Sequence, residues 1–271
     1  MTTVAGGGPQ SAAAVARRSA EVIRALRAVD DEELLAPSAL PGWDRLTIVC
    51  HLRYGAIALD RMTRAAVDGH AASYYPEGRS RQRSSTLQPE PGEHPSDVVA
   101  SLARRSADLD ALWSVLTEEQ WLLETDEPPD NPDLGALPLA RLALLRLTEV
   151  EVHGGDLQLG LDDWSQVFVE SALAFRLDWL NTRRPGRRDP DGGTDGSWLL
   201  LATDGPTYLV TTTGTSLSSR PARPTTPADA VIEASSRDLL ALLLGRPLLQ
   251  PARCSGDADL AAGFSHAFPG P

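Results

Sequence analysis

Two histidines and a glutamate stand at positions from which they could hold a metal ion. Glu149 and His153 are four residues apart in a stretch with a helical pattern, so their side chains share one helix face. His51 lies in a second helical stretch, about a hundred residues earlier. Two imidazoles and one carboxylate leave a divalent metal one open coordination position, as catalytic zinc sites require. The three residues therefore predict a metal site that activates a molecule entering from outside.

Each of these residues also has an interpretation without a metal. A lone histidine such as His51 is most often partly buried and bonded to a backbone carbonyl, and an i,i+4 pair such as Glu149 and His153 is common on solvated helix faces. Residues such as Leu147 and Val150, however, make this helix apolar on most sides. Because a charged side chain on a largely buried helix needs a partner or a metal, the surroundings favour the metal site.

Four helical stretches must position these side chains. Apolar residues recur at helical spacing over residues 11–29, 44–62, 96–116 and 139–158. Asp44 is expected to cap the second of these helices. Successive amphipathic helices predict a bundle, in which metal sites are commonly built from inward-facing side chains. Residues 69–95, rich in Gly, Pro, Ser and Arg, are expected to form a long loop.

Beyond residue 164 the pattern becomes that of a smaller α+β domain. The expected elements are a helix over 166–181, a charged linker over 183–196, strands over 198–203, 208–213 and 230–234, and helices over 236–245 and 257–267. Asp204-Gly205-Pro206 predicts a hairpin between the first two strands. The predicted fold class is α+β, with a four-helix bundle at 1–164 and an α+β domain at 165–271.

Composition excludes several classes of protein. The 271 residues carry a net charge of −12, which argues against a general nucleic-acid binder. No apolar run reaches the roughly 18 residues of a membrane span, and residues 1–10 lack the pattern of a secretory signal. Cys50 and Cys254 lie far apart and indicate no disulfide framework. We therefore expect a cytoplasmic protein, a monomer or small homo-oligomer, that binds neither membranes nor nucleic acid.

Further motifs surround the candidate ligands. They are Pro41-Gly42-Trp43 before His51, Glu149-Val150-Glu151-Val152-His153 followed by Asp156-Leu157, Tyr75-Pro76, Asp163-Trp164, and Asp238-Leu239-Leu240 with Leu244-Gly245-Arg246. Together they resemble the mycothiol-dependent maleylpyruvate isomerase family over most of the chain. The resemblance implies that the N-terminal bundle is a DinB-like metal-binding domain.

The resemblance also implies roles for individual residues. His51, Glu149 and His153 would be the ligands of Zn²⁺ or a similar divalent ion. Asp156 matches an acidic active-site residue of the family and is expected to assist the chemistry without binding the metal. An arginine of the C-terminal domain completes the family's site. The best match for it is Arg246, and its competitors are Arg220 and Arg237. Arg79 and Arg81 of the long loop could bind an acidic substrate in place of a C-terminal arginine.

The implied reaction is the addition of a thiolate to an electrophilic small molecule. A metal-bound thiol is deprotonated and nucleophilic. Because neither Cys50 nor Cys254 stands at a ligand position, the thiol is expected to come from a cosubstrate. By resemblance this is mycothiol, the low-molecular-weight thiol of actinobacteria, which fits a chain whose 25 basic residues are all arginine.

The outcome of that addition is left open by the sequence. The family's isomerases convert maleylpyruvate by cis–trans isomerisation, and related transferases keep the thiol adduct. Two alternatives from other classes remain, namely a non-catalytic metal-binding or regulatory DinB-like protein and a hydrolase that uses metal-bound water.

The residues beside the ligands carry two further expectations. Glu151, two positions from both Glu149 and His153, should face elsewhere on the helix and stay outside the ligand set. Gly154 and Gly155 lie inside the helix, where each glycine costs about 0.5–1 kcal/mol relative to alanine. They are expected to permit close approach of a bulky molecule, or else to mark early fraying of the helix.

Overall fold

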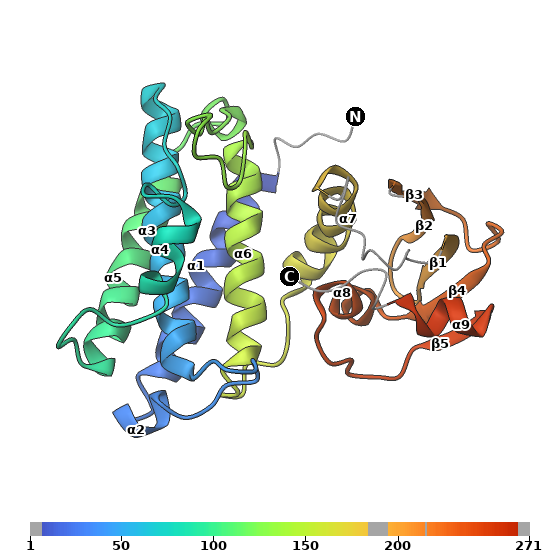
Figure 1. Ribbon diagram of the computed structural model, residues 1–271, viewed down its shortest axis with the longest axis horizontal. Helices are drawn as coiled ribbons and strands as arrows, with labels where there is room; N and C mark the ends of the chain where they lie inside the picture. Colours follow the sequence, from blue (N-terminus) through green and yellow to red (C-terminus); the bar gives the residue numbers. More distant parts are fainter. Residues whose placement is uncertain (1–6, 184–194, 215, 265–271) are drawn as a thin grey trace. The chain divides into compact units, whose positions relative to one another are not determined.

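The computed structural model of the protein describes residues 7–183, 195–214 and 216–264. The chain divides into two units, Met1–Phe168 and Val169–Pro271. The first unit is built from helices, and the second combines helices with a five-stranded sheet (Figure 1). This arrangement confirms the predicted fold class.

Four long helices form the body of the first unit. They are α1 (Gly7–Leu26), α3 (Arg45–Asp68), α5 (Pro95–Ser114) and α6 (Leu139–Asp156). Both α1 and α3 pack against α5 and α6, and each of the four buries an apolar stripe, as predicted. The carboxylate of Asp44 accepts a 2.7 Å hydrogen bond from the backbone N–H of Thr47, which confirms it as the cap of α3. Within the described residues, no helix combines the length and apolarity needed to cross a membrane.

The structure differs from the prediction in the segment expected to be a long loop. Residues Arg79–Thr86 form a helix, α4, between α3 and α5. Its sequence, RSRQRSST, has no apolar residue and therefore none of the periodicity by which helices are recognised. Contacts with other segments hold it instead: the guanidinium of Arg79 bonds both carboxylate oxygens of Asp133 and lies over the ring of Tyr75. Two shorter helices, α2 (Asp31–Leu34) and η2 (Gln120–Leu122), complete the unit.

The second unit is built on a mixed sheet with the strand order β3-β2-β1-β4-β5. Its elements are β1 (Gly196–Ala202), β2 (Thr207–Thr213), β3 (Ser216–Ala222), β4 (Ala230–Ala234), β5 (Arg253–Gly256), α8 (Ser236–Leu244) and α9 (Ala258–Ala262), and α7 (Gln166–Arg183) leads into it. Strands β1 and β2 form the predicted hairpin, and β4 runs parallel to β1. Both α8 and α9 pack on β4.

The two edge strands, β3 and β5, were not expected from the sequence. Their segments, SLSSRPA and RCSG, are too polar to give a strand signal, and every residue of β5 is exposed. Backbone pairing with β2 and β4 makes them strands. Most of the expected linker at 183–196, and the end of the helix expected at 257–267, lie outside the described residues.

Candidate metal centre

The three candidate ligands meet at one point in the first unit. One ligand atom from each of His51, Glu149 and His153 lies within 4.8 Å of the other two. Oε2 of Glu149 is 2.6 Å from Nε2 of His51 and 3.4 Å from Nε2 of His153. Two imidazole nitrogens and a carboxylate oxygen are a donor set that zinc prefers. The residues present therefore fit a divalent ion.

Electrostatics favour positive charge at this point. Burial lowers the pKa of His51, although Glu149 acts in the opposite direction. Burial would raise the pKa of Glu149, but the two histidines hold it well below its ordinary value. For His153, the hydrogen bonds with Asp156 and Glu149 outweigh burial and raise its pKa to about 9. The site thus presents an ionised carboxylate between two imidazoles.

Access to the site is uneven. The side chain of Glu149 is 39% exposed, whereas those of His51 and His153 are 14% and 13% exposed. Of the three candidate ligands, Glu149 therefore has the most exposed side chain.

Side chains of two arginines bring the ligand-bearing helices together. Nε of Arg45, at the start of α3, donates a 2.8 Å hydrogen bond to the carbonyl of Leu157, just past the end of α6. Nη1 of the buried Arg146, on α6, donates a 2.8 Å bond to the carbonyl of Leu52, the neighbour of His51 on α3. Gly55 allows this approach, because a Cβ there would lie 3.1 Å from Nη1 of Arg146. The two contacts fix His51 opposite the C-terminal half of α6.

Aromatic side chains complete the surroundings of the ligands. The ring of Trp43 stacks on His153 at 6.3 Å between centroids and meets His51 edge-on at 5.7 Å. Burial, and then the charge of Glu149, raises the pKa of the Tyr74 hydroxyl. The sequence pointed to Trp43 only through the Pro-Gly-Trp motif, and it gave no sign of Tyr74 or Arg146 as neighbours of the site.

Comparison with known families identifies this helical unit. The family model described as the mycothiol maleylpyruvate isomerase N-terminal domain matches residues 6–158. The chain belongs to this family. The matched region contains His51, Glu149, His153 and Asp156. No curated protein sequence matches the chain.

This member of the mycothiol maleylpyruvate isomerase family also resembles solved structures over both of its units. The crystal structure of the mycothiol-dependent maleylpyruvate isomerase has a TM-score of 0.67 and 22% sequence identity, and the match covers 95% of this chain and 98% of that one. A histidine-to-alanine variant of that isomerase gives a TM-score of 0.66 at the same identity and coverage. The second unit therefore shares the fold of these structures as well.

Asp156 contacts His153, one of the three candidate metal ligands. Its Oδ2 lies 2.9 Å from Nδ1 of His153, and the residue is only 4% exposed. The other nitrogen of His153, Nε2, points to Glu149. A carboxylate bonded to the second nitrogen of a metal-binding histidine orients the ring and raises its basicity. The contact fits a role in which Asp156 orients His153, and the part in the chemistry expected from the sequence stays a prediction.

Replacing Asp156 with asparagine is expected to weaken zinc binding by about 10–100-fold, as is usual when a residue hydrogen-bonded to a metal-binding histidine is changed. The amide keeps the shape but loses the charge that supports His153. Competition with a chromophoric chelator measures the affinity, and Asp162→Asn, at an exposed position, is the matched control. Unchanged zinc affinity in Asp156→Asn would contradict the orienting role.

The candidate arginines lie in different parts of the family fold. Nη1 of Arg246, which follows α8, donates a 3.0 Å bond to the carbonyl of Leu244, and Nη1 of Arg237 bonds Asp238 and the carbonyl of Pro247. Arg220 is exposed on β3. All three belong to the second unit, so a part for any of them in the site stays a prediction. Arg79 and Arg81 lie on α4, in the same unit as the ligands.

The neighbours of the ligands on α6 serve packing. Glu151 is fully buried away from the ligand set, with its Oε2 3.1 Å from Nε of Arg18 on α1 and with Ser165 bonded to its carboxylate. The expectation that Gly154 admits a bulky molecule is wrong, since a Cβ there would lie 3.2 Å from Nη2 of Arg18. Helix α6 continues to Asp156, so Gly154 does not mark fraying either. It lets the side chain of Arg18 pass close to α6.

Proposed function

We propose that the protein is a zinc-dependent enzyme that uses mycothiol to attack an electrophilic small molecule. The observation that carries this proposal is the convergence of one atom each from His51, Glu149 and His153. Membership of the family supports it, because the similar crystal structures are of a mycothiol-dependent maleylpyruvate isomerase.

The chain's own residues have separable tasks in this proposal. A zinc ion held by two histidines and a carboxylate keeps one coordination position open and favours the thiolate form of a bound thiol. His51, Glu149 and His153 hold the ion, and Asp156 keeps Nε2 of His153 turned toward it through the bond to Nδ1. Trp43 covers the two imidazoles from one side.

The thiol comes from outside the chain in this proposal. Burial raises the pKa of Cys50 to about 11, so this thiol stays protonated at neutral pH and is a poor nucleophile. Cys254 is exposed on β5, in the second unit. Both cysteines are free, in keeping with an external thiol as the reacting group.

Two outcomes of thiol addition fit the same site. In an isomerase, the adduct of a cis alkene rotates about the new single bond and then eliminates the thiol. In an S-transferase, the adduct is the product. We assign Arg246 to the binding of an acidic substrate in either case, since a guanidinium can hold a carboxylate through two hydrogen bonds.

Mass spectrometry and chromatography of one incubation distinguish these outcomes. The zinc-loaded protein is incubated with mycothiol and maleylpyruvate, and in parallel with other electrophilic alkenes. A product of unchanged mass that requires mycothiol indicates an isomerase, and a product heavier by one mycothiol indicates a transferase. Zinc-free protein should do neither. Cleavage of the substrate by water without a thiol would indicate a hydrolase, and bound zinc without any turnover would indicate a binding protein. Either result contradicts the proposal.

A further inference from the structure

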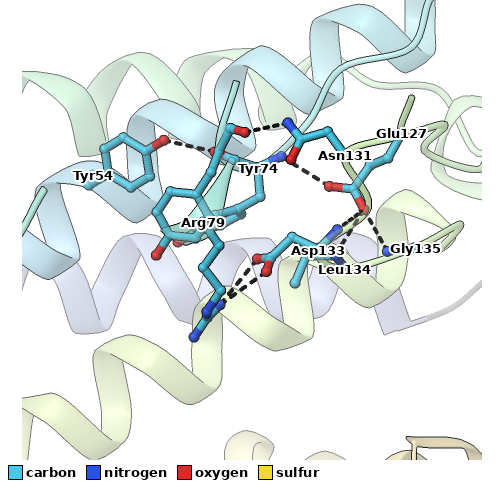
Figure 2. A network of polar contacts seen from close by, with 9 residues as sticks. Tyr54, Tyr74, Arg79, Glu127, Asn131, Asp133, Leu134 and Gly135 are labelled. Atoms are coloured by element: carbon cyan, nitrogen blue, oxygen red, sulfur yellow. Dashed lines mark hydrogen bonds and ion pairs between the residues drawn. The ribbon is translucent and has the colours of Figure 1, made fainter. Parts of the chain in front are cut away.

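The backbone of Tyr74, in the loop after α3, is fixed by hydrogen bonds on both sides of its peptide unit. Its N–H donates a 3.0 Å bond to Oε1 of Glu127, a carboxylate that also accepts three other backbone N–H groups (Figure 2). Its carbonyl accepts 2.8 Å bonds from the hydroxyl of Tyr54 and from Nη2 of Arg61. The position of Tyr74 is therefore set before any ligand arrives.

The ring of Tyr74 is packed against two other tyrosines. Its centroid lies 5.7 Å from that of Tyr54 and 4.9 Å from that of Tyr75, both in edge-on contacts. The residue is half-buried. Because backbone and ring are both held, the hydroxyl group points in a fixed direction, which lowers the entropic cost of any contact that it makes with a ligand.

The hydroxyl of Tyr74 reaches the facing sides of the two ligand-bearing helices. A Cβ on Gly55 of α3 would lie 3.3 Å from this hydroxyl oxygen and 3.1 Å from Nη1 of Arg146 on α6. Gly55 follows His51 by four residues, and Arg146 precedes Glu149 by three. Residues at these spacings are neighbours on one helix face. The hydroxyl therefore lies about one helical turn, roughly 5 Å along the helices, from the level of the candidate ligands.

This hydroxyl is free to donate a hydrogen bond to a bound molecule. It makes no hydrogen bond with any residue that the structure describes. The neighbouring guanidinium of Arg146 offers only donors and cannot accept its proton. A tyrosine hydroxyl is protonated at neutral pH, and a partly buried donor without an acceptor gains by finding one.

We propose that Tyr74 donates a hydrogen bond to the carbonyl oxygen of an electrophile whose reacting C=C bond is conjugated to that carbonyl. The proposal rests on the function proposed above and narrows it, since it names the chemical class of the substrate. Both the donor and the ligands belong to the first unit, so the contact needs no residue of the second.

Addition of a thiolate to such an alkene places negative charge where Tyr74 donates. The sulfur forms a bond to the carbon β to the carbonyl, the C=C pair moves between the α carbon and the carbonyl carbon, and the C=O π pair moves onto oxygen. Tyr74 keeps its proton and stabilises this enolate oxygen through the hydrogen bond. Reversal of the same shifts expels the thiolate in an isomerase, and a proton taken from water by the α carbon completes the adduct in a transferase.

Infrared difference spectroscopy tests the contact without turnover. The probe is cyclohexenone, an uncharged ketone with a conjugated C=C bond, bound to the zinc-loaded full chain in the absence of thiol. Because a donated hydrogen bond lowers the C=O stretching frequency, the bound probe should absorb at lower frequency in the unmodified protein than in Tyr74→Phe. Equal frequencies in the two proteins would overturn the proposal.

The same variant shows whether Tyr74 serves the fold instead. Tyr74→Phe removes only a hydroxyl that has no hydrogen-bond partner in the described part of the chain, so its zinc content and Tm should equal those of the unmodified protein. A lowered Tm or lost zinc would mean that the hydroxyl supports the structure, which contradicts the role proposed here.

Two uncharged electrophiles separate the effect on the carbonyl from a general loss of activity. With mycothiol, cyclohexenone reacts by addition, whereas iodomethane reacts by displacement of iodide and develops no charge on a carbonyl oxygen. Tyr74→Phe should lower kcat/KM for cyclohexenone by about 100-fold, as when one donor to a developing oxyanion is removed, and leave that for iodomethane unchanged. Equal losses with both electrophiles, or no loss with cyclohexenone, would overturn the proposal.

Tyr75→Phe is the matched control. It removes the neighbouring hydroxyl of the same aromatic cluster, and no atom of Tyr75 lies within 4 Å of the Cβ position of Gly55. This variant should keep the carbonyl frequency and both values of kcat/KM. Losses in Tyr75→Phe equal to those in Tyr74→Phe would contradict the assignment to one hydroxyl.

Failure of this inference differs measurably from failure of the proposed function. If neither electrophile is converted while the carbonyl frequency still depends on Tyr74, the hydrogen bond stands and the proposed reaction fails. If both electrophiles are converted equally well by the unmodified protein and Tyr74→Phe, the reaction stands and Tyr74 is not the donor.

Discussion

Replacing His153 with alanine is expected to abolish stoichiometric binding of zinc. The variant removes one of three ligand atoms that lie within 4.8 Å of one another and leaves two, too few for a stable site. The loss in zinc affinity should exceed the roughly 10–100-fold loss that is typical when a residue hydrogen-bonded to a metal ligand is removed. Elemental analysis after dialysis measures the metal content directly, and thiol-dependent turnover should vanish with the metal.

Two companion variants make this result specific. Glu149→Gln keeps the shape of the side chain but removes the charge that lies 2.6 Å from Nε2 of His51, so it should also lose zinc. His70→Ala removes an exposed histidine just past the end of α3, and this variant should retain one full equivalent of zinc. Retention of one zinc per chain by His153→Ala would show that the metal is bound elsewhere or by another set of residues.

The bundle could be predicted because its helices carry a strong apolar pattern. Residues such as Val22 on α1 and Leu109 on α5 recur at helical spacing and are buried in the structure. Helix α4 could not be predicted in this way, because contacts with Asp133 and Tyr75 hold it and no apolar stripe does. Strands β3 and β5 were missed for the same reason, since pairing with neighbours defines them.

The site was only partly readable from the sequence. Spacing alone placed Glu149 and His153 on one helix face, and the structure brings His51 to them. Two hydrogen bonds hold the ligand-bearing helices in register. The bond from Arg146 to Leu52 spans 94 positions of sequence, and the bond from Arg45 to Leu157 spans 112. No local sequence pattern predicts contacts between residues so far apart in the chain. Arg146, three residues before Glu149 on a largely apolar helix, is a polar side chain that needs a partner, but the sequence does not show that its partner is the backbone beside His51.

Helix α6, which carries two of the ligands, depends on a buried ion pair on its opposite side. Nε of Arg18 on α1 lies 3.1 Å from Oε2 of Glu151, whose side chain is fully buried. Nη2 of the same arginine donates a 2.6 Å hydrogen bond to the carbonyl of Leu161 in the loop after α6. This single guanidinium therefore ties α1 both to the ligand helix and to the loop that follows it.

Replacing Arg18 with methionine is expected to destabilise the first unit by about 3–5 kcal/mol, because Glu151 would be left as a buried charge without its partner. For a unit of this size, such a loss lowers Tm by roughly 6–20 °C. Differential scanning calorimetry of the unmodified protein and the variant, each with saturating zinc, measures the shift. Arg17→Met, at the exposed neighbouring position on α1, is the matched control and should leave Tm nearly unchanged.

The double variant Arg18→Met with Glu151→Gln separates the lost charge pair from lost packing. Because replacing both members of a buried pair costs far less than removing one, this variant should recover a large part of the lost stability. Its zinc affinity should stay close to that of the unmodified protein, since Glu151 lies on the side of α6 that faces α1 and contacts neither imidazole. A Tm in Arg18→Met equal to that of the unmodified protein would mean that the ion pair does not stabilise α6. A loss of zinc in the double variant, with stability restored, would instead show that Glu151 supports the metal centre directly.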